Sequence, residues 1–160
     1  MSEYFISIKG LKQGQFKGDQ PDRIGRADWI AGTAFTLELS QPRDEHTGLP
    51  TGKRQWKPIQ ITMQWGAASP QILQALATNE TLNPVIFEFT RTTPDGKEQV
   101  YQTITLTNAT IVNVSRALGA DESQQIHSFE IEVVEFTFQK ITMQDTTGGT
   151  MFTDDWEASS

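Results

Sequence analysis

The second half of this chain is dominated by a two-residue hydrophobic repeat, which constrains the fold more than any other feature. Apolar and polar residues alternate along residues 84–93 and 98–107, and a third apolar segment follows Asn108. A period of two places successive side chains on opposite faces of an extended chain, which is typical of half-buried β-strands. The intervening Pro94-Asp95-Gly96 is a turn sequence, because proline fixes φ and glycine accepts positive φ. We therefore predict a β-hairpin over these two segments.

The last long repeat, over residues 129–143, changes phase twice. Apolar residues occupy odd positions up to Val133, even positions from Val134 to Phe138, and odd positions again from Ile141. One extra residue in a strand moves all later side chains to the other face, so this pattern predicts a strand of about 16 residues bent by β-bulges. A strand bent in this way favours a barrel or a strongly coiled sandwich over a flat sheet.

The first half adds further strands and the one helix. Apolar and polar residues alternate at the end of segment 26–39 and along segment 57–65, which predicts a strand in each. A bend is expected near Gly32 in the first segment. Ser69 suits the N-cap of a helix and Pro70 suits its first position, because proline lacks an N–H that would be unpaired there. A short amphipathic helix is therefore predicted after these residues.

These elements together predict a mainly β protein. We expect a single-domain β-barrel or sandwich of two antiparallel sheets with one short α-helix. The domain is predicted to cover residues 1–146. Residues 147–160 are predicted to form a C-terminal tail that is rich in glycine and then acidic.

Composition excludes several classes of function. The chain contains no cysteine, so it forms no disulfide, thiolate metal site or cysteine nucleophile. Its formal net charge of −7 disfavours a nucleic-acid partner, because phosphate contacts need clustered Lys and Arg. The N-terminal segment lacks a signal-peptide pattern, and no run of about 18 apolar residues occurs that would insert into a membrane. We expect the chain to be cytoplasmic when made.

No catalytic or metal-binding constellation is recognisable. His46 lies in a polar loop and His127 begins a strand pattern, and neither has a third ligand at a metal-site spacing. No nucleophile-elbow sequence occurs, and the early glycines are not followed by a helix as they are in a phosphate-binding loop. We therefore predict no catalytic residue, no metal and no cofactor, and the chain is not expected to be an enzyme.

Residues 40–55 form a long segment without periodicity. They include two prolines, two glycines and Leu49 as the one large apolar residue. Loops longer than about 12–15 residues are uncommon in compact domains and usually carry function or disorder. We interpret this segment as an exposed arm that contacts a partner. Its candidate residues, with charges of both signs, are Arg43, Asp44, Glu45, Lys53 and Arg54.

Short segments spread over most of the chain resemble one protein family. They are residues 5–14 (FISIKGLKQG), 52–55 (GKRQ), 57–59 (KPI), 73–76 (LQAL), 135–141 (EFTFQKI) and 154–156 (DDW). Together and in this order, they resemble the haemolysin-coregulated protein (Hcp) family, the tube subunits of type VI secretion. The resemblance implies a barrel of two packed antiparallel sheets with a helix alongside, a fold similar to that of phage tail-tube proteins.

The resemblance also implies a structural function. Members of that family assemble into hexameric rings, the rings stack into a hollow tube, and a contractile sheath expels the tube towards a target cell. The implied partners are other copies of this chain, the sheath and spike proteins of the secretion machine, and small effectors carried in the lumen. The protein would leave the cell through this machine without a signal peptide.

Two sets of site residues follow from the resemblance. The charged residues of the 40–55 arm are expected to make directional polar contacts between stacked rings. The lumen is expected to be lined near Ala31, Gly32 and Thr33, where this chain departs from the aromatic-rich stretch ending in Trp-Gly that is more usual in the family. Unpaired edges of the sheets are expected to pair between neighbouring subunits.

One function of a different class remains open. A monomeric β-sandwich binding module would recognise a carbohydrate or peptide through the same long loop. Such a module predicts a monomer or dimer with a ligand groove, whereas a tube subunit predicts a ring. The oligomeric state therefore separates the two hypotheses.

Overall fold

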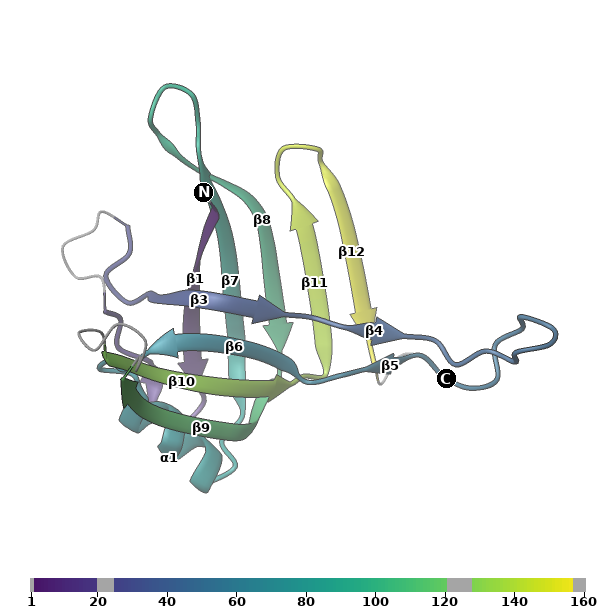
Figure 1. Cartoon of the computed structure of the whole chain (residues 1–160), viewed down its shortest axis with the longest axis horizontal. Coiled ribbons are helices and arrows are strands. Elements are labelled where there is room, and N and C mark those ends of the chain that lie inside the picture. Colours follow the sequence, from purple (N-terminus) through teal and green to yellow (C-terminus); the bar gives the residue numbers. More distant parts are fainter. Residues whose placement is uncertain (1, 20–24, 121–127, 157–160) are drawn as a thin grey trace.

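The structure is a computed structural model that describes residues 2–19, 25–120 and 128–156. Most of it is one ten-stranded antiparallel sheet (Figure 1). In sheet order the strands are β12 (Thr150–Asp155), β11 (Lys140–Asp145), β8 (Glu98–Thr107), β7 (Leu82–Thr92), β1 (Ser2–Gly10), β3 (Ile30–Thr36), β6 (Ile59–Gln64), β10 (Ser128–Thr137) and β9 (Thr110–Ala120), with β2 (Gly14–Gln15) paired to β1. The remaining elements are β4 (Leu39–Ser40) and β5 (Gln55–Trp56), which pair with each other, and α1 (Ser69–Ala77).

The large sheet bends strongly, so that its two parts face each other. In Figure 1, β1, β7, β8, β11 and β12 run side by side, and β3, β6, β10 and β9 cross in front of them. Fully buried apolar side chains from both parts fill the space between them, and each contributes about 1.5–3 kcal/mol by its burial. Examples of these side chains are Ile6, Ile61, Phe87, Val134 and Phe136.

The predicted fold class is confirmed in its main terms. The protein is mainly β, its sheets are antiparallel, and the described chain has one helix. The predicted hairpin is formed by β7 and β8, and Gly96 in its turn has a φ of 83°. The large sheet does not close, because β12 and β9 lie at its two ends. Of the two predicted forms, the described residues therefore build a bent, sandwich-like sheet and not a closed barrel.

The single bent strand predicted over residues 129–143 is wrong. Two strands cover this segment, β10 and β11, and they lie far apart in the order of the sheet. The chain leaves β10 at Phe138-Gln139, which explains the second change of phase. The first change of phase is not a bulge, because the buried positions of β10 are all even-numbered.

Glu132 explains why the pattern misled. Its side chain is fully buried, so a charged residue occupies a core position while the apolar Ile131 and Val133 point outward and are half-buried. One carboxylate oxygen accepts a hydrogen bond from the Ser69 hydroxyl at the start of α1, and Arg116 Nε lies 3.4 Å from the same oxygen. Buried carboxylates persist where such partners compensate for lost solvation. Periodicity alone assigns a position of this kind to the surface.

The bend predicted near Gly32 is confirmed. The register between β3 and β6 shifts between Gly32 and Ala34. The ring of Tyr4 packs against Gly32 so closely that a Cβ on this glycine would lie 2.1 Å from Tyr4 Cζ. The Tyr4 hydroxyl donates a hydrogen bond to the Ala34 carbonyl, and burial raises the pKa of this phenol. Glycine therefore provides the room that the tyrosine needs at this crossing.

Glu80 holds the turn between β1 and β2. Its side chain is 2% exposed, and Oε2 accepts hydrogen bonds from the backbone N–H groups of Lys12 (2.9 Å) and Gln13 (2.8 Å). Oε1 accepts a third bond from the side-chain amide of Gln13 at 3.0 Å. Burial by itself would raise the pKa of Glu80, but these hydrogen bonds outweigh burial and keep the pKa below its ordinary value. The turn is therefore built around a charged carboxylate.

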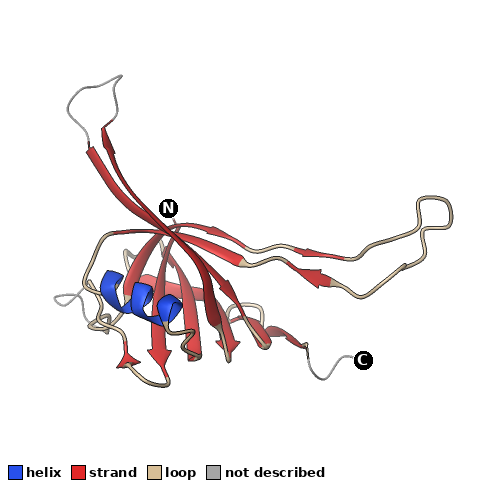
Figure 2. Cartoon of the chain, turned by 90° about the horizontal axis from the view of Figure 1, so that it is seen from below, coloured by secondary structure: helices blue, strands red, loops and turns tan. Residues whose placement is uncertain are grey.

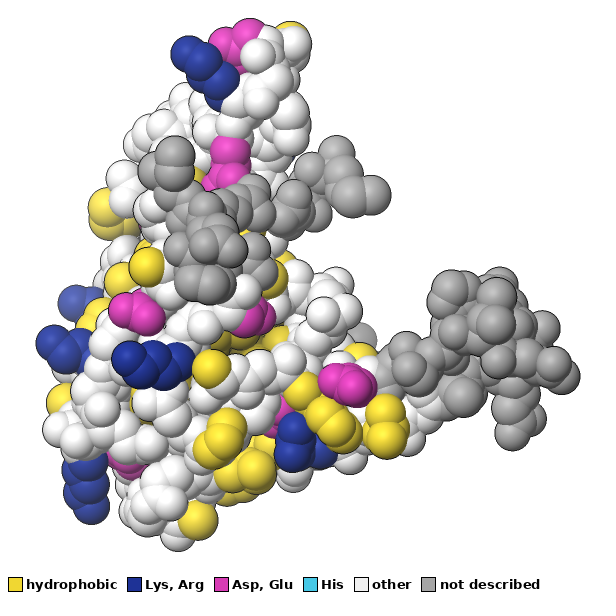
Figure 3. Space-filling view, turned by 90° about the vertical axis from the view of Figure 1, so that its left-hand side faces the viewer, with side chains coloured by type: hydrophobic (Ala, Val, Ile, Leu, Met, Phe, Trp, Pro, Cys, Tyr) yellow, Lys and Arg dark blue, Asp and Glu magenta, His cyan; other side chains and the backbone are white. Residues whose placement is uncertain are grey.

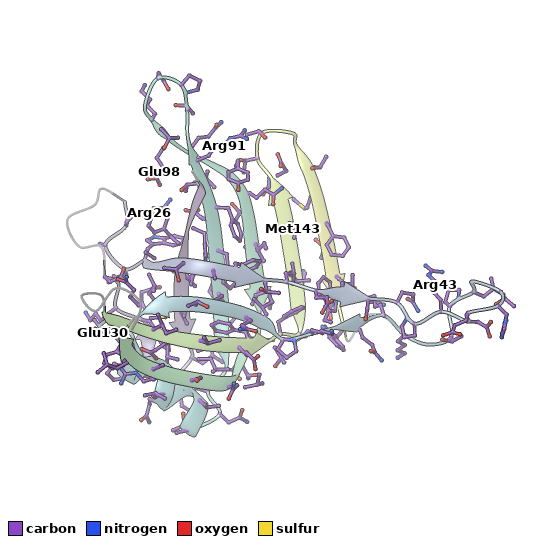
Figure 4. The ribbon with its side chains drawn as sticks, in the orientation of Figure 1. Arg26, Arg43, Arg91, Glu98, Glu130 and Met143 are labelled. Atoms are coloured by element: carbon purple, nitrogen blue, oxygen red, sulfur yellow. The ribbon has the colours of Figure 1, made fainter. Side chains whose placement is uncertain are left out.

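Arg26 covers the outer side of the sheet. Its guanidinium lies 4.5 Å from the ring centroid of Phe5 and 4.9 Å from that of Trp29. It also binds Glu88 at 2.6 Å and Glu98 at 3.0 Å, and Figure 4 shows Arg26 and Glu98 reaching toward each other. This arrangement explains why Phe5 is fully buried although it is not part of the central apolar cluster that contains its neighbours Tyr4 and Ile6.

The helix α1 lies close to its predicted place. Ala68 is the N-cap instead of Ser69, whose hydroxyl binds Glu132. Pro70 is therefore the second helical residue and not, as was predicted, the first, but it still lies in the first turn. Asn79 follows the helix with a φ of 53°, a left-handed conformation that commonly ends helices. The described part of the chain contains no helix with the length and apolar character needed to cross a membrane.

Candidate assembly surfaces

The arm at residues 40–55 is an ordered β-ribbon. It starts where β4 pairs with β5, and it continues through hydrogen bonds from the Thr51 N–H to the Pro42 carbonyl (3.0 Å) and from the Asp44 N–H to the Leu49 carbonyl (2.9 Å). Figures 1 and 2 show that it projects far from the body of the molecule. The segment is therefore exposed, as predicted, but its backbone is paired along much of its length.

Asp44 organises the tip of the arm. Its Oδ1 accepts hydrogen bonds from the backbone N–H groups of His46 (2.7 Å) and Thr47 (3.0 Å). These bonds, with that of Thr47 as the larger cause, hold the pKa of Asp44 below its ordinary value. The closed turn leaves Glu45 exposed and Leu49 64% exposed.

The root of the arm is fastened to β12. Arg54 donates hydrogen bonds to both carboxylate oxygens of Asp154, from Nε at 2.6 Å and from Nη2 at 2.5 Å, and the indole N–H of Trp56 donates to the same carboxylate at 2.8 Å. Alternation along β12 points Asp154 to the inner side of the sheet, which brings it to these partners. The bridge to Arg54 lowers the pKa of Asp154 and raises that of Arg54. We call this arrangement the root bridge.

A small cavity lies beside the root bridge. It has a volume of about 90 Å³ and is lined by Lys53, Arg54, Trp56 and Trp156. Both indoles pack edge-on against Phe138, with ring centroids 5.5 Å away for Trp56 and 6.5 Å away for Trp156. The lining therefore combines two aromatic and two cationic side chains.

The structure separates the five charged residues that were predicted to contact a partner. Arg43, Asp44 and Glu45 lie at the tip of the arm, whereas Lys53 and Arg54 lie at its root. The arm thus carries two charged groups at opposite ends. Figure 4 shows Arg43 on the projecting part of the ribbon.

Most of these charges are used within the chain. Arg43 donates a hydrogen bond to the Gly48 carbonyl at 3.2 Å, and the Asp44 and Arg54 side chains are held in the contacts described above. Glu45 and Lys53 are exposed, and neither forms an ion pair with another described residue. The side chains of these two residues are therefore unconstrained by contacts within the described chain, whereas Arg43 keeps its positive charge but is held at the Gly48 carbonyl.

The sequence reading missed the participation of Asp154 and Trp156 in the arm. It placed them in a tail, although residues 150–155 form β12. A signal was present in Trp156 itself, since tryptophan is enriched where an apolar contact meets a polar surface. Which contact it makes depends on pairing between strands that are far apart in sequence.

The outer face of β3, β6, β10 and β9 is nearly neutral. Alternation directs to this face the side chains that do not enter the core. They include Thr33, Thr36, Gln60, Thr62, Gln64, Asn113, Ser115, Ala117, Ile131 and Val133. Within the described part of these strands, Glu135 is the one charged side chain on this face, and it is half-buried.

The three residues predicted to line a lumen lie on β3, but their environments differ. Ala31 is half-buried and pairs with Phe5, whereas Gly32 lies against the ring of Tyr4. Thr33 is exposed, and its hydroxyl donates a hydrogen bond to the Thr62 carbonyl at 3.2 Å. Thr33 is therefore the one of the three with an exposed side chain on this neutral face.

The open sheet has two edge strands. In the described chain, β12 pairs with β11 alone and β9 pairs with β10 alone. Each carries exposed apolar side chains, Met151 (65% exposed) and Phe152 (45%) on β12, and Val112 (45%) and Leu118 (65%) on β9. Unpaired backbone groups beside exposed apolar side chains are suited to pairing with another chain.

The side of the molecule that faces away from the arm has a mixed surface. Figure 3 shows acidic and basic side chains interspersed there, with hydrophobic side chains between them in its lower half. Of the two histidines, His46 is exposed at the tip of the arm, and His127 lies outside the described residues. Among the described residues, no group of three or more His, Asp or Glu side chains is placed to hold a metal ion.

Comparisons with known proteins identify the family. The family described as "Type VI secretion system effector, Hcp" matches residues 5–144. The "Major exported protein" of Pseudomonas aeruginosa is 34% identical over 163 residues, which cover 96% of this chain and 95% of that protein. The chain therefore belongs to the Hcp family of type VI secretion proteins.

Solved structures of Hcp proteins have the same fold. A crystal structure of an Hcp protein matches with a TM-score of 0.89 and 26% identity, covering 98% of both chains. The Hcp1 protein from the E. coli EAEC 042 pathovar matches with a TM-score of 0.84 and 27% identity, covering 96% of this chain and 98% of that one. The resemblance found in the sequence is thus confirmed.

Proposed function

We propose that this chain is a structural subunit of the inner tube of type VI secretion. Six copies form a ring, the rings stack into a hollow tube, a contractile sheath expels the tube, and small effectors travel in its lumen. Membership of the Hcp family supports a function in type VI secretion. The open sheet with two free edges supports assembly from several copies of the chain. The open sheet is the observation on which the proposal chiefly rests.

Ring closure uses the two edges of the sheet. β12 and β9 differ in sequence and lie at opposite ends of the sheet, so a contact between the β12 side of one copy and the β9 side of the next is heterologous. A heterologous contact generates a closed ring when its rotation closes. The exposed apolar side chains on both strands would be buried in such a contact, which favours it.

The arm is the stacking element. It projects from the body as a paired ribbon, so it reaches a neighbouring ring without losing much conformational entropy on contact. Among the five charged residues predicted for this role, Glu45 and Lys53 have side chains unconstrained by the described chain, while the side chains of Arg43, Asp44 and Arg54 are held in contacts that shape the arm itself.

The neutral outer face of β3, β6, β10 and β9 lines the lumen. A wall with threonine, glutamine, serine and alanine side chains presents little fixed charge to a cargo. Thr33 contributes to this wall, while Ala31 and Gly32 set the course of the strand that carries it. From the sequence, the lumen lining was predicted on β3 alone, whereas the proposed wall includes residues of all four strands.

The remaining partners follow from the same function. The sheath surrounds the tube and the spike caps it, and neither contact calls for a catalytic group on this chain. The protein is made in the cytoplasm and leaves through the type VI machine. Its function is to assemble, and it acts as a structural protein and not as an enzyme.

Negative-stain electron microscopy of the purified protein, paired with mass by light scattering, tests this proposal. Rings with a central hole and a mass of about six times 17.9 kDa are expected. A dispersed monomer of 17.9 kDa at high concentration would overturn it and favour the carbohydrate- or peptide-binding module instead.

A shortened arm tests the stacking role separately. Removing residues 42–51 and closing the ribbon with an Asn-Gly turn keeps the root bridge between Arg54 and Asp154. Rings are expected to form, with far fewer tubes. Tubes of unchanged length and number would show that the arm does not stack rings.

A further inference from the structure

The cavity at the root of the arm has no role in the assembly described so far. Its volume is about 90 Å³, and its walls include the indoles of Trp56 and Trp156. An apolar cavity of about 150 Å³ holds a benzene molecule, so this smaller space suits a single branched aliphatic side chain. The cavity is therefore a candidate socket for one residue of a partner.

The socket is held open by contacts on both sides. The Trp56 indole donates to Asp154 at 2.8 Å and packs against Phe138, and Trp156 also packs against Phe138. Its walls are fixed before any partner arrives, because each indole is held by its own contacts. Binding to a preformed socket costs less ordering than binding to a mobile one.

Charge at the socket restricts the partner. Arg54 is neutralised by Asp154 in the root bridge, whereas Lys53 is exposed and forms no ion pair with another described residue. The socket therefore offers one available cation beside an apolar opening. It fits an aliphatic side chain that lies close to a carboxylate.

The tip of the same arm carries this combination. Leu49 is 64% exposed, and Glu45, four residues earlier in the same closed turn, is exposed without an ion pair to a described residue. Leu11 is also exposed, at 65%, but Lys12 follows it, and a second cation near Lys53 is unfavourable. The tip also holds Arg43, at the Gly48 carbonyl, but Asp44 and Glu45 outnumber this cation, so the tip is net negative. Charge complementarity to Lys53 therefore favours Leu49 over Leu11.

We propose that Leu49 of one copy of this chain inserts into the socket of a second copy, with Glu45 facing Lys53 of that copy. The contact is between copies, because tip and socket lie at opposite ends of one paired ribbon (Figure 2). It specifies where the stacking arm of the proposed tube docks, and so it rests on that function. The root bridge then has a second purpose, which is to keep the socket in shape.

Cysteine cross-linking tests the contact directly. The chain has no cysteine of its own, so Leu49→Cys and Lys53→Cys variants each carry a single thiol. Mixed in equal amounts under mild oxidation, they are expected to give a disulfide between positions 49 and 53 of different copies, identified by mass spectrometry. The matched mixture of Leu11→Cys with Lys53→Cys, which uses an equally exposed leucine, is expected to give none.

Charge exchange tests the same contact without cysteines. Glu45→Lys and Lys53→Glu alone are each expected to reduce tube formation, and the double variant is expected to recover it. Leu49→Asp should weaken association roughly tenfold or more, while Leu11→Asp leaves it unchanged.

The outcomes separate the two proposals. Rings in micrographs with equal cross-linking in both cysteine mixtures, or with no recovery in the double variant, would overturn the docking contact and leave the tube proposal intact. A 49–53 cross-link in a protein that forms no rings would support the docking contact and overturn the tube.

Discussion

At the residue scale, close packing at a few positions determines whether the strands fit together. Tyr4 and Gly32 meet where β1 crosses β3, and the tyrosine ring fills the space that a side chain on residue 32 would need. Packed interiors respond to the addition of even one methyl group. This pair therefore couples the two parts of the bent sheet.

We predict that Gly32→Ala destabilises the fold by about 1–3 kcal/mol, because its methyl group overlaps the Tyr4 ring. Urea unfolding is the measurement. Gly52→Ala is the matched control, since a Cβ there meets no atom within 4 Å. Equal urea midpoints for the two variants would show that the close approach of Tyr4 to Gly32 does not affect the free energy of unfolding.

Glu80 is expected to make stability depend on pH. Its pKa lies below the ordinary value of 4.5, so the charged form stabilises the folded state. That contribution is complete above the unfolded pKa and is lost as pH falls through the lower folded pKa. Glu80→Gln removes it, because the uncharged amide can turn its oxygen to the N–H groups of Lys12 and Gln13 only by pointing its NH2 group at the side-chain amide of Gln13, which is also a donor.

The measurement for Glu80 is the unfolding midpoint of wild type and Glu80→Gln between neutral pH and pH 3. The difference between the proteins is expected to be greatest at neutral pH and to shrink below pH 4.5. A difference that stays constant with pH would contradict the prediction.

At this scale, burial was predictable from the sequence for side chains that need no specific contact residue, and not for side chains that do. The alternation of Val85, Phe87 and Phe89 predicted the inner face of β7, because these residues bury themselves without specific partners. Glu132 was not predictable, since its burial depends on Ser69 and on other strands. The local hydrophobic pattern predicts which apolar side chains are buried, whereas the burial of a polar side chain can be recognised only once its hydrogen-bond partners in the tertiary structure are known.

At the element scale, the arm and β12 behave as one unit. A bidentate bridge joins Arg54 to Asp154, whose side chain is only 11% exposed. Such charge-assisted pairs are stronger and more directional than pairs at the open surface. The sequence predicted an exposed arm from its prolines, glycines and charges, but its pairing into a ribbon and its attachment to β12 were not predicted.

We predict that Asp154→Asn loosens the root of the arm without unfolding the protein. Loss of the charge weakens both hydrogen bonds from Arg54, so amide hydrogen exchange at residues 53–56 should become roughly tenfold faster. Glu38→Gln, which removes a highly exposed pair with Lys57, is the control and should leave exchange unchanged. Similar exchange in both variants would argue against the bridge.

At the scale of the whole molecule, the neutral wall and the two free edges belong to one bent sheet. The fold class was predictable from periodicity, because a strand pattern repeated through most of the chain allows few architectures. That the sheet stays open was not predictable from periodicity, because it depends on which strands become neighbours. The same holds for the wall, which collects outward residues from four strands.

We predict that a cysteine on the wall becomes protected in tubes. In Ser115→Cys, a large polyethylene-glycol maleimide should react readily with dissociated subunits and slowly with tubes, while a small alkylating reagent should react with both. The small reagent controls for loss of thiol reactivity. Equal protection from both reagents would place Ser115 in a subunit contact and not on an open lumen.

The root bridge also has a mechanical meaning. A pull on the arm is shared with β12, because Arg54 and Asp154 connect them across 100 positions of sequence. From β12 the load passes into β11 through six paired residues, and from there into β8. Force that would peel apart an unsupported two-stranded ribbon is thus spread across hydrogen-bonded strands that resist together, which suits the proposed function as a subunit of an expelled tube.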